Sequence, residues 1–395
     1  VMIRMLLAIC LFFSLSTEAQ TLVESKILFG RTIGRQPYLD YGLGSDRLGG
    51  AKMTYLDTGI LVQAVDSTIG RYKIQLSKNR TAWLQKANFQ KVNSIKIEPY
   101  YLTSSFLING DDKYDLVSIN LDEKLPYTSI QQINPSRIVV DIFGATSNTN
   151  WVTHRTSAKE IKNVYHEQVE DDVFRVIIEL KHKQHWGYSI YYEGKKLFIK
   201  VKRQPEDLSL ENMKIAIDAG HGGNNPGASG ISTKIVEKNY TLLIANQIEK
   251  ALMEKEAIVF MTRRSDNNYS MLEREERIRD ENVDFLISVH LNSSVREEVK
   301  GVSTYYRYIG FRPLTKYIQE SMIKIDGLED FGNIGSFNFA LSGPTDYPNC
   351  LLEVAFLSNR DDEKLILSPE FHKQVAKQVV EGIKDWLKSC KEEND

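Results

Sequence analysis

Short apolar runs alternate with helix-like segments along the second half of the chain, from Met213 onward. The apolar runs lie at 215–218, 257–261, 285–289, 302–308 and 350–356. Segments with apolar residues at helical spacing lie at 237–254, 272–279, 313–325 and 371–387. Strands that alternate with helices favour parallel pairing, because each helix carries the chain back across the sheet. This order predicts an α/β domain over residues 213–390, with a mostly parallel central sheet flanked by helices.

Chemically active residues stand at the ends of these predicted elements. His221 follows the first apolar run in a glycine-rich turn, His290 follows the third run, and Glu353 lies in the last one. Glu237 begins the first helix-like segment. Because open α/β sheets bind their ligands at the carboxyl ends of the strands, we expect these four side chains to share one cleft.

Two histidines and a carboxylate are the ligand set of a catalytic zinc site, which keeps its fourth position open. His221, Glu237 and His290 can supply this set for one zinc ion per chain. Zinc lowers the pKa of bound water to about 7 and polarises a carbonyl group. Glu353 fits the catalytic role of a base that takes a proton from this water and passes it to a leaving amide nitrogen.

Six motifs resemble the successive motifs of the zinc-dependent N-acetylmuramoyl-L-alanine amidases. They are IDAGHGG at 217–223, VEKN at 236–239, TRRSD at 262–266, LEREERI at 272–278, ISVHLNSS at 287–294 and LLEVAFLSN at 351–359. The resemblance implies a peptidoglycan hydrolase that cuts the amide bond between N-acetylmuramic acid and L-alanine of the stem peptide. Its implied role is cell-wall remodelling or daughter-cell separation. It also implies that His221, Glu237 and His290 bind the metal and that Glu353 is the catalytic glutamate.

Other motif positions of the family are also present. Arg263, Arg274 and Asn292 match recurrent positions, and we expect them to orient neighbouring groups or to contact substrate. The chain departs from the family at Asn225, where aspartate is usual, and at Leu291, where a small residue is common. Neither departure removes a ligand, but both affect the shape of the cleft.

The spacing of the last two motifs bears on how open the site is. Some members of this family cover the zinc with an inserted helix. Only 62 residues separate His290 from Glu353, and they must also form a strand and a helix. We therefore predict a largely open site, walled by the loop at 331–342, in a protein that is active without a partner.

A chain of 395 residues is too long for one compact domain, since hydrophobic cores stop growing below that size. Residues 20–92 consist of short strand-like runs separated by glycine-containing turns, which predicts a small all-β domain. The alternating run at 72–76, the turn at Lys78 and Asn79, and the next strand at Trp83 resemble a bacterial SH3-like domain. An unrelated small β-barrel would give the same pattern.

A second all-β domain is predicted at 93–204. The phrases RIVVDIF at 137–143 and RVIIEL at 175–180 each contain an arginine, a β-branched core and an acid, which suggests two related half-sheets. The runs at 188–192 and 196–201 predict a closing hairpin. This region resembles the AMIN domain that precedes cell-wall amidases, which implies attachment to peptidoglycan or to an envelope protein. A packing domain without a ligand is the alternative.

The two ends of the chain, and the stretch between the last two domains, have features of their own. Residues 1–19 have the layout of a secretory signal peptide, with Arg4 before an apolar run too short for a stable membrane span. Cleavage after Ala19 would place the protein in the periplasm or outside the cell. A lipoprotein signal at Cys10 is a minor alternative, because Ile9 is too bulky for that cleavage. The polar residues 205–212 are predicted to be a linker, and 391–395 a tail.

Composition and missing motifs limit the competing functions. Fifty basic and 52 acidic residues give a net charge of −2, which gives no reason to expect nucleic-acid binding. A serine or cysteine hydrolase would need a nucleophile elbow, but no G-x-S-x-G motif is present, and Cys350 lies in an apolar run as a buried hydrophobe would. A catalytically inactive envelope scaffold, and a zinc amidase or peptidase that acts on another envelope amide, remain as alternatives.

Overall fold

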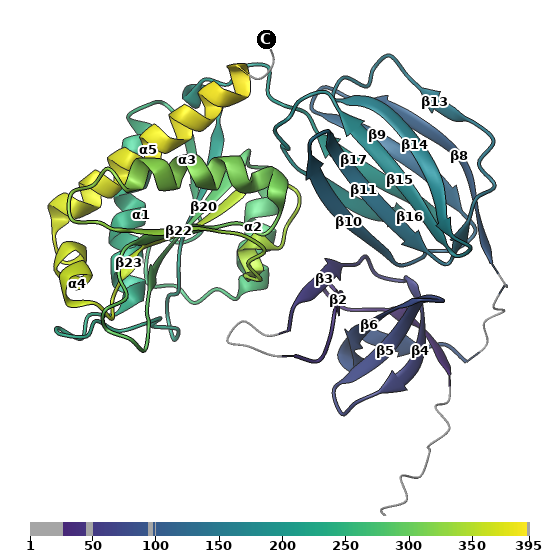
Figure 1. The fold of residues 1–395 in the computed structure, drawn as a ribbon, viewed down its shortest axis with the longest axis horizontal. Coiled ribbons are helices and arrows are strands. Elements are labelled where there is room, and N and C mark those ends of the chain that lie inside the picture. Colours follow the sequence, from purple (N-terminus) through teal and green to yellow (C-terminus); the bar gives the residue numbers. More distant parts are fainter. Residues whose placement is uncertain (1–26, 45–49, 94–97, 99, 393–395) are drawn as a thin grey trace, which may run out of the picture.

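The structure is a computed structural model that describes residues 27–44, 50–93, 98 and 100–392. It contains a small β-barrel, a two-sheet β-region and a C-terminal α/β region, which lie beside one another (Figure 1). The predicted signal peptide at 1–19 lies outside the described residues. None of the helices in the described part of the chain has the length and hydropathy needed to span a membrane.

The N-terminal β-barrel consists of seven strands in which every neighbouring pair is antiparallel. The strands are β1 (Leu28–Thr32), β2 (Tyr38–Asp40), β3 (Lys52–Tyr55), β4 (Leu61–Ser67), β5 (Arg71–Ser77), β6 (Arg80–Gln85) and β7 (Phe89–Lys91), in the order β3-β2-β6-β5-β4-β1-β7. Ile74 and Ala82, partners across β5 and β6, are fully buried. Within the alternating run at 72–76, Ile74 and Leu76 are buried, and Lys73 and Gln75 are only partly buried. The SH3-like resemblance of this region stays a prediction.

The second β-region packs two sheets against each other. One has the order β10-β11-β15-β14, and the other β12-β8-β9-β17-β16 with β13 beside β8. The strands are β8 (Tyr101–Gly110), β9 (Tyr114–Leu121), β10 (Tyr127–Ile133), β11 (Ser136–Phe143), β12 (Ala145–Thr146), β13 (Val152–His154), β14 (Ile161–Glu170), β15 (Val173–Leu180), β16 (Tyr188–Glu193) and β17 (Lys196–Lys202). The predicted closing hairpin is confirmed as β16 and β17, whose turn contains Gly194 at φ 58°.

The interpretation of the two repeated phrases as separate half-sheets is wrong. They form β11 and β15, which are antiparallel neighbours in one sheet. In this register the arginine of each phrase lies opposite the acid of the other. Arg137 pairs with Glu179 at 2.6 Å, and Arg175 pairs with Asp141 at 2.7 Å. The repeat therefore reflects cross-strand charge pairing, which stabilises adjacent antiparallel strands.

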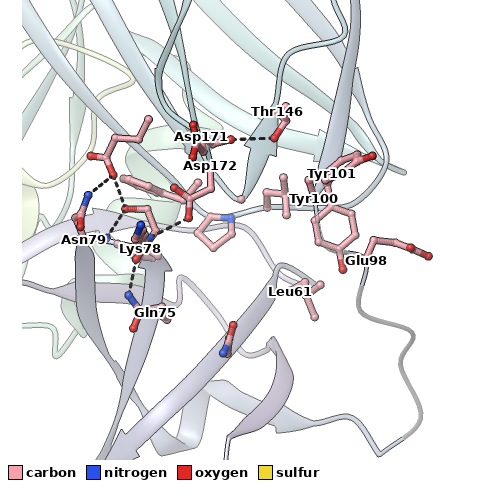
Figure 2. A pocket seen from close by; sticks show the side chains of 18 of the residues that line it. Leu61, Gln75, Lys78, Asn79, Glu98, Tyr100, Tyr101, Thr146, Asp171 and Asp172 are labelled. Carbon is pink, nitrogen blue, oxygen red and sulfur yellow. Dashed lines mark hydrogen bonds between the residues drawn. The ribbon is translucent and has the colours of Figure 1, made fainter.

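The barrel and the second β-region share one continuous cluster of buried apolar side chains. Beside it lies a groove of about 930 Å³ lined by residues from both units. Figure 2 shows Lys78 and Asn79 at one end of this groove, and Tyr100 and Tyr101 at the other. The backbone N–H of Lys78 donates to Asp172 at 2.9 Å, and the Asn79 amide donates to Glu170 at 3.1 Å. Polar contacts between the two units therefore accompany the shared core.

The C-terminal region is built around a mixed six-stranded sheet in the order β19-β18-β20-β23-β21-β22. Its strands are β18 (Lys214–Ala219), β19 (Ile258–Met261), β20 (Phe285–Asn292), β21 (Val302–Tyr305), β22 (Asp330–Ile334) and β23 (Asn349–Phe356). The β21–β23 pair is antiparallel and the other four pairs are parallel. Five helices accompany the sheet: α1 (Glu237–Met253), α2 (Met271–Asp280), α3 (Arg312–Met322), α4 (Arg360–Ile366) and α5 (Pro369–Glu392).

Alternate residues of the central strands face two different layers. Ile215 and Ile217 belong to the large buried cluster that includes residues of α1, α3 and α5. Ala216, between them, belongs to a smaller cluster that includes Ile278 of α2. Helices therefore lie on both faces of the sheet, as Figure 1 also shows. Two elements, α4 and β22, lie where the sequence indicated only loop, and the strand predicted at 302–308 ends at Tyr305.

The second β-region contributes an aromatic side chain to the core of the C-terminal region. Trp186 belongs to the large apolar cluster of that region, and its ring lies 5.1 Å from the ring of Trp386 in α5. Both indoles are almost completely buried. Their N–H groups donate to Gln204 at 3.1 Å and to Gln184 at 2.9 Å, respectively. Leu208, in the predicted linker, is buried in the same cluster.

Candidate metal centre

His221 is presented by a tight turn at the end of β18. Its own φ is 61°, and Gly222 and Gly223 have φ values of 126° and 55°, so three consecutive residues lie at positive φ. Only glycine adopts this region without strain, which explains why glycines follow the histidine. The turn carries the imidazole out of the sheet, and His221 is only partly buried.

Two buried arginines hold the backbone of this turn. The guanidinium of Arg263 donates to the carbonyls of Ala219 at 2.8 Å and Lys238 at 2.7 Å, which joins β18 to α1. Arg274, on α2, donates to the Asp218 carboxylate at 2.6 Å and to the carbonyl of His221. Among the bonds of the described residues, those of the two guanidinium groups go to backbone carbonyls, Asp218 and Thr241, and none goes to an imidazole or to Glu237. Both arginines therefore shape the loop that presents His221.

Three potential ligand side chains converge from β18, α1 and β20. Oε1 of Glu237 lies 3.0 Å from Nε2 of His221 and 3.0 Å from Nδ1 of His290. One ligand atom from each of the three residues lies within 4.8 Å of the others. The structure thus brings together all three residues that the sequence predicted as ligands.

Glycines leave the space that these side chains occupy. A Cβ atom at Gly220 would lie 2.4 Å from Cε1 of His290. A Cβ atom at Gly227 would lie 2.4 Å from Oε2 of Glu237 and 2.8 Å from Cδ2 of His221. Contacts this short do not occur, so a larger residue at position 220 would displace His290, and one at position 227 would displace Glu237 and His221.

Hydrogen bonds fix the orientation of the cluster. Nδ1 of His221 lies 3.0 Å from Oδ1 of Asn225, which cannot donate, so the proton resides on Nδ1 and the Nε2 lone pair faces Glu237. The Glu237 carboxylate accepts the backbone N–H groups of Ala228 at 2.8 Å and Leu291 at 3.1 Å. Asn225 thus supplies the acceptor that an aspartate would provide.

The cluster fits a metal ion on two grounds. Nε2 of His290 is buried and has no hydrogen-bond partner among the residues that the structure describes. Buried polar atoms are normally satisfied, and a neutral imidazole nitrogen is a common metal ligand. The donors are two imidazoles and one carboxylate, which is the set that catalytic zinc sites use.

The protonation of Glu237 and His290 bears on whether the cluster can bind a cation. Burial opposes ionisation of Glu237, but its contacts with the two histidines outweigh burial and hold its pKa well below the ordinary value. Burial disfavours the charged form of His290, but the hydrogen bond with Glu237 and the charge of Glu353 raise its pKa overall. Glu237 is therefore a carboxylate at neutral pH, ready to bind a cation.

Glu353 lies beside the three potential ligands. It sits on β23 directly opposite His290 of β20 in a parallel register, and opposite Ser303 of β21. Register partners on neighbouring strands point to the same face of a sheet. The partly buried Glu353 carboxylate therefore lies on the face that carries His290.

Asn292 has a less direct position. It lies two residues beyond His290, and its amide donates to the Tyr305 hydroxyl at 3.3 Å. Its Oδ1 accepts the N–H of Ser293 at 2.8 Å. Asn292 therefore ties the end of β20 to β21 and has no recorded bond to the three potential ligands.

An aromatic group beside the cluster was missed by the sequence reasoning. The ring of Phe339 lies 5.5 Å from the imidazole of His290 in an edge-to-face arrangement, and Phe337 lies 4.4 Å from Tyr305. The predicted loop wall at 331–342 begins with β22 and then carries these two rings. The alternating aromatics in the sequence F-N-F were the only signal available.

Comparison with known proteins agrees with this site. Residues 215–385 match the family model of N-acetylmuramoyl-L-alanine amidase, and residues 106–201 match that of the AMIN domain. The probable cell wall amidase LytH of Staphylococcus epidermidis is 32% identical over 182 residues, which are 46% of this chain and 60% of that protein. LytH of Staphylococcus saprophyticus is 27% identical over 313 residues, 77% of this chain and 97% of that protein.

A solved structure is also similar. The catalytic domain of CwlV, an N-acetylmuramoyl-L-alanine amidase from Bacillus (Paenibacillus) polymyxa var. colistinus, is 30% identical, with a TM-score of 0.43. The match covers 45% of this chain and 98% of that domain. The family that the six motifs predicted, and the AMIN resemblance, are confirmed by the two family models. The chain therefore carries a domain of the N-acetylmuramoyl-L-alanine amidase family at residues 215–385, behind an AMIN domain at residues 106–201.

Proposed function

We propose that this protein hydrolyses peptidoglycan at the amide bond between N-acetylmuramic acid and L-alanine, with one zinc ion per chain. The observation that carries this proposal is the convergence of His221, Glu237 and His290 with Glu353 beside them. The family match at residues 215–385 supports the choice of bond. Fold alone would not specify a substrate, but this set of side chains suits amide hydrolysis.

The residues have distinct roles in the proposed reaction. His221, Glu237 and His290 hold the metal, which when bound supplies Lewis-acid polarisation of a carbonyl and acidification of water. The Glu353 carboxylate takes a proton from the attacking water and delivers it to the leaving amide nitrogen. Asn225 keeps the proton of His221 on Nδ1, so that Nε2 remains a ligand.

Arg263, Arg274 and Asn292 are assigned supporting roles. The two arginines hold the backbone turn that carries His221. Asn292 links β20 to β21 behind His290 and Glu353. Such residues affect a metal site through the orientation of its ligands.

We further propose a domain organisation with boundaries at 20–92 for the SH3-like barrel, 93–204 for the AMIN domain, 205–212 for a linker and 213–390 for the catalytic domain. The protein acts in the periplasm or outside the cell, in wall remodelling or daughter-cell separation. Its partners are peptidoglycan and, through either β domain, an envelope protein. A solved relative, the CwlD amidase of Clostridioides difficile, forms a complex with the GerS lipoprotein.

Identification of the released products tests the proposal. Residues 20–395, purified and incubated with muramoyl-peptide fragments, should release peptides that begin with a free L-alanine amine. Chelation should abolish this release, and added zinc should restore it. Cleavage between two amino acids would replace the amidase with an envelope peptidase, and intact fragments at every metal loading would favour the inactive scaffold.

A further inference from the structure

One segment near the candidate metal centre is held by all three parts of the molecule. We define residues 335–346 as the wall segment. Within the C-terminal region, the N–H of Phe337 donates to the carbonyl of Tyr306 at 3.1 Å. The AMIN domain binds the other end, where the N–H of Tyr188 donates to the carbonyl of Thr345 at 2.7 Å and the Thr345 hydroxyl donates back at 2.7 Å.

The barrel holds the middle of the wall segment. The side-chain amide of Asn338 donates to the carbonyl of Gly50 at 2.8 Å. A second bond runs beside it, from the guanidinium of Arg307 to the carbonyl of Lys52 at 2.7 Å. Both acceptors are backbone carbonyls: Lys52 is the first residue of β3, and Gly50 lies two residues before that strand. The acceptor of Arg307 is therefore part of a strand, and the acceptor of Asn338 lies in the segment that leads into it.

Asn338 stands between the two rings that line the metal side. Residue 339 has extended backbone, with φ −93° and ψ 147°. In extended backbone, successive side chains point to opposite sides. Phe337 and Phe339 accordingly approach Tyr305 and His290, whereas Asn338 reaches the barrel. Fixing Asn338 therefore fixes the ring that contacts a potential metal ligand.

Two glycines lie at close contacts between the wall segment and the two β domains. A Cβ atom at Gly343 would lie 2.8 Å from the ring of Tyr55 in the barrel. A Cβ atom at Gly187 would lie 2.1 Å from the carbonyl oxygen of Asp346. Both glycines allow a β domain to touch the wall segment directly. The barrel and the AMIN domain thus form a close-fitting brace on two sides.

We propose that Asn338 is a positioning residue through which the N-terminal barrel holds Phe339 against His290 and so shapes the substrate cleft. This inference rests on the proposed amidase function, which it extends by giving the barrel a part in the active site. Phe339 is the apolar wall that substrate meets beside the metal. Loss of the Asn338 bond should let the wall segment move without removing any metal ligand.

A double-mutant cycle in the full chain tests this coupling. We expect Asn338→Ala to lower kcat/KM by about fivefold or more, the ratio that corresponds to one ordinary hydrogen bond, while zinc content stays at the parent level. In a Phe339→Ala background the same substitution should have no further effect, because residues that act through each other are not additive. Independent, additive losses would overturn the proposal.

Two further variants keep the result interpretable. Asn338→Asp has the same size but cannot donate to Gly50, so it should reproduce the loss without opening a cavity. Tyr114→Phe removes the 2.6 Å bond from Tyr114 to Asn282, another contact between domains that lies outside the wall segment. This control should retain parent kcat/KM. An equal loss in the control would mean that general domain docking, and not Asn338, is responsible.

Hydrogen exchange separates this proposal from the proposed function. The amides of Phe337, Ser342 and Gly343 are hydrogen-bonded within and beside the wall segment. They should exchange faster in Asn338→Ala than in the parent or in Tyr114→Phe. If the parent releases no L-alanine peptides but this exchange pattern is observed, the proposed amidase function is wrong, and the proposed role of Asn338 in holding the wall segment is still supported. If these amides exchange at the parent rate in Asn338→Ala, Asn338 does not hold the wall segment, whatever the activity of the variant.

Discussion

Oδ1 of Asn225 accepts a hydrogen bond from Nδ1 of His221 across 3.0 Å, while Nε2 of the same ring faces Glu237. The same amide oxygen also accepts the N–H of Gly227 at 3.2 Å. One side chain thus sets the tautomer of a potential ligand and the path of the loop beyond it. Although Asn225 departs from the family motif, its amide oxygen accepts both bonds, as a carboxylate oxygen could.

Substitution of Asn225 should change metal affinity in a predictable order. Asn225→Ala removes the acceptor, and we expect zinc affinity to fall by about ten- to a hundredfold, the usual effect of losing a group that orients a ligand. Asn225→Asp keeps an acceptor and should hold zinc at least as well as the parent. Competition with a chelator of known affinity measures both. Equal affinities for the Ala variant and the parent would rule out an orienting role.

Loss of Glu353 should remove activity but not metal. Glu353→Gln keeps the size of the side chain but cannot accept a proton, so release of L-alanine peptides should fall by roughly 10²- to 10⁴-fold. Zinc content, measured on the same samples, should equal that of the parent. If the variant retains parent activity, another group is the base. If it loses zinc, Glu353 belongs to the ligand set.

Loss of His290 should have the opposite pattern, with the metal itself lost. His290→Ala removes one of three donors and leaves the Glu237 carboxylate buried beside one imidazole. We expect zinc to be lost on dialysis and activity to disappear with it. His154→Ala, at an exposed histidine of β13, is the matched control and should retain both. A zinc-loaded His290→Ala protein would exclude this residue as a ligand.

Glu275 should make the stability of the protein depend on pH. It lies on α2 beside a cavity of about 350 Å³ where all three domains meet, and it is 4% exposed. Burial raises its pKa from 4.5 to about 7, against a hydrogen bond with Gln36 and the charges of Arg279 and Lys52. The folded protein therefore keeps the proton of Glu275 at pH values where the unfolded chain has released it.

The sign of this effect follows from proton binding. The stabilisation is complete below about pH 4.5 and is lost as pH rises to about 7, because only the unfolded chain loses a proton in that window. The free energy of unfolding should fall by at most about 3 kcal/mol from this group. Glu275→Gln should not share this loss, so denaturant unfolding of both proteins at several pH values isolates it. A constant difference across pH 4.5 to 8 would contradict the prediction.

The strands of the C-terminal region and the positions of its potential ligands were predictable because their signals are local. An apolar run followed by a glycine-rich turn both ends β18 and exposes His221, and His290 sits near the end of a second run in the same way. The helix periodicity at 237–254 placed Glu237 at the first residue of α1. Parallel pairing of β18, β20 and β23 then brings these positions together at the carboxyl ends of the strands.

Features that depend on pairing between distant segments were not predictable in this way. The sequence could not tell that RIVVDIF and RVIIEL are neighbours, because their antiparallel register appears only when Arg137 meets Glu179. Likewise, the contact between Phe339 and His290 could not be predicted, because only the folded chain brings the two rings together. The orienting role of Asn225 depends on the left-handed turn that follows His221.

The indole of Trp186 makes the core of the C-terminal region depend on the sequence that precedes that region. The side chain comes from the AMIN side of the boundary yet occupies the apolar core beneath α5, where it touches Trp386. A fragment that begins at Met213 would leave an empty space of indole size under its last helix, and such cavities cost several kcal/mol for a large aromatic. A C-terminal region joined to a different neighbour would therefore need another side chain to fill the space of Trp186.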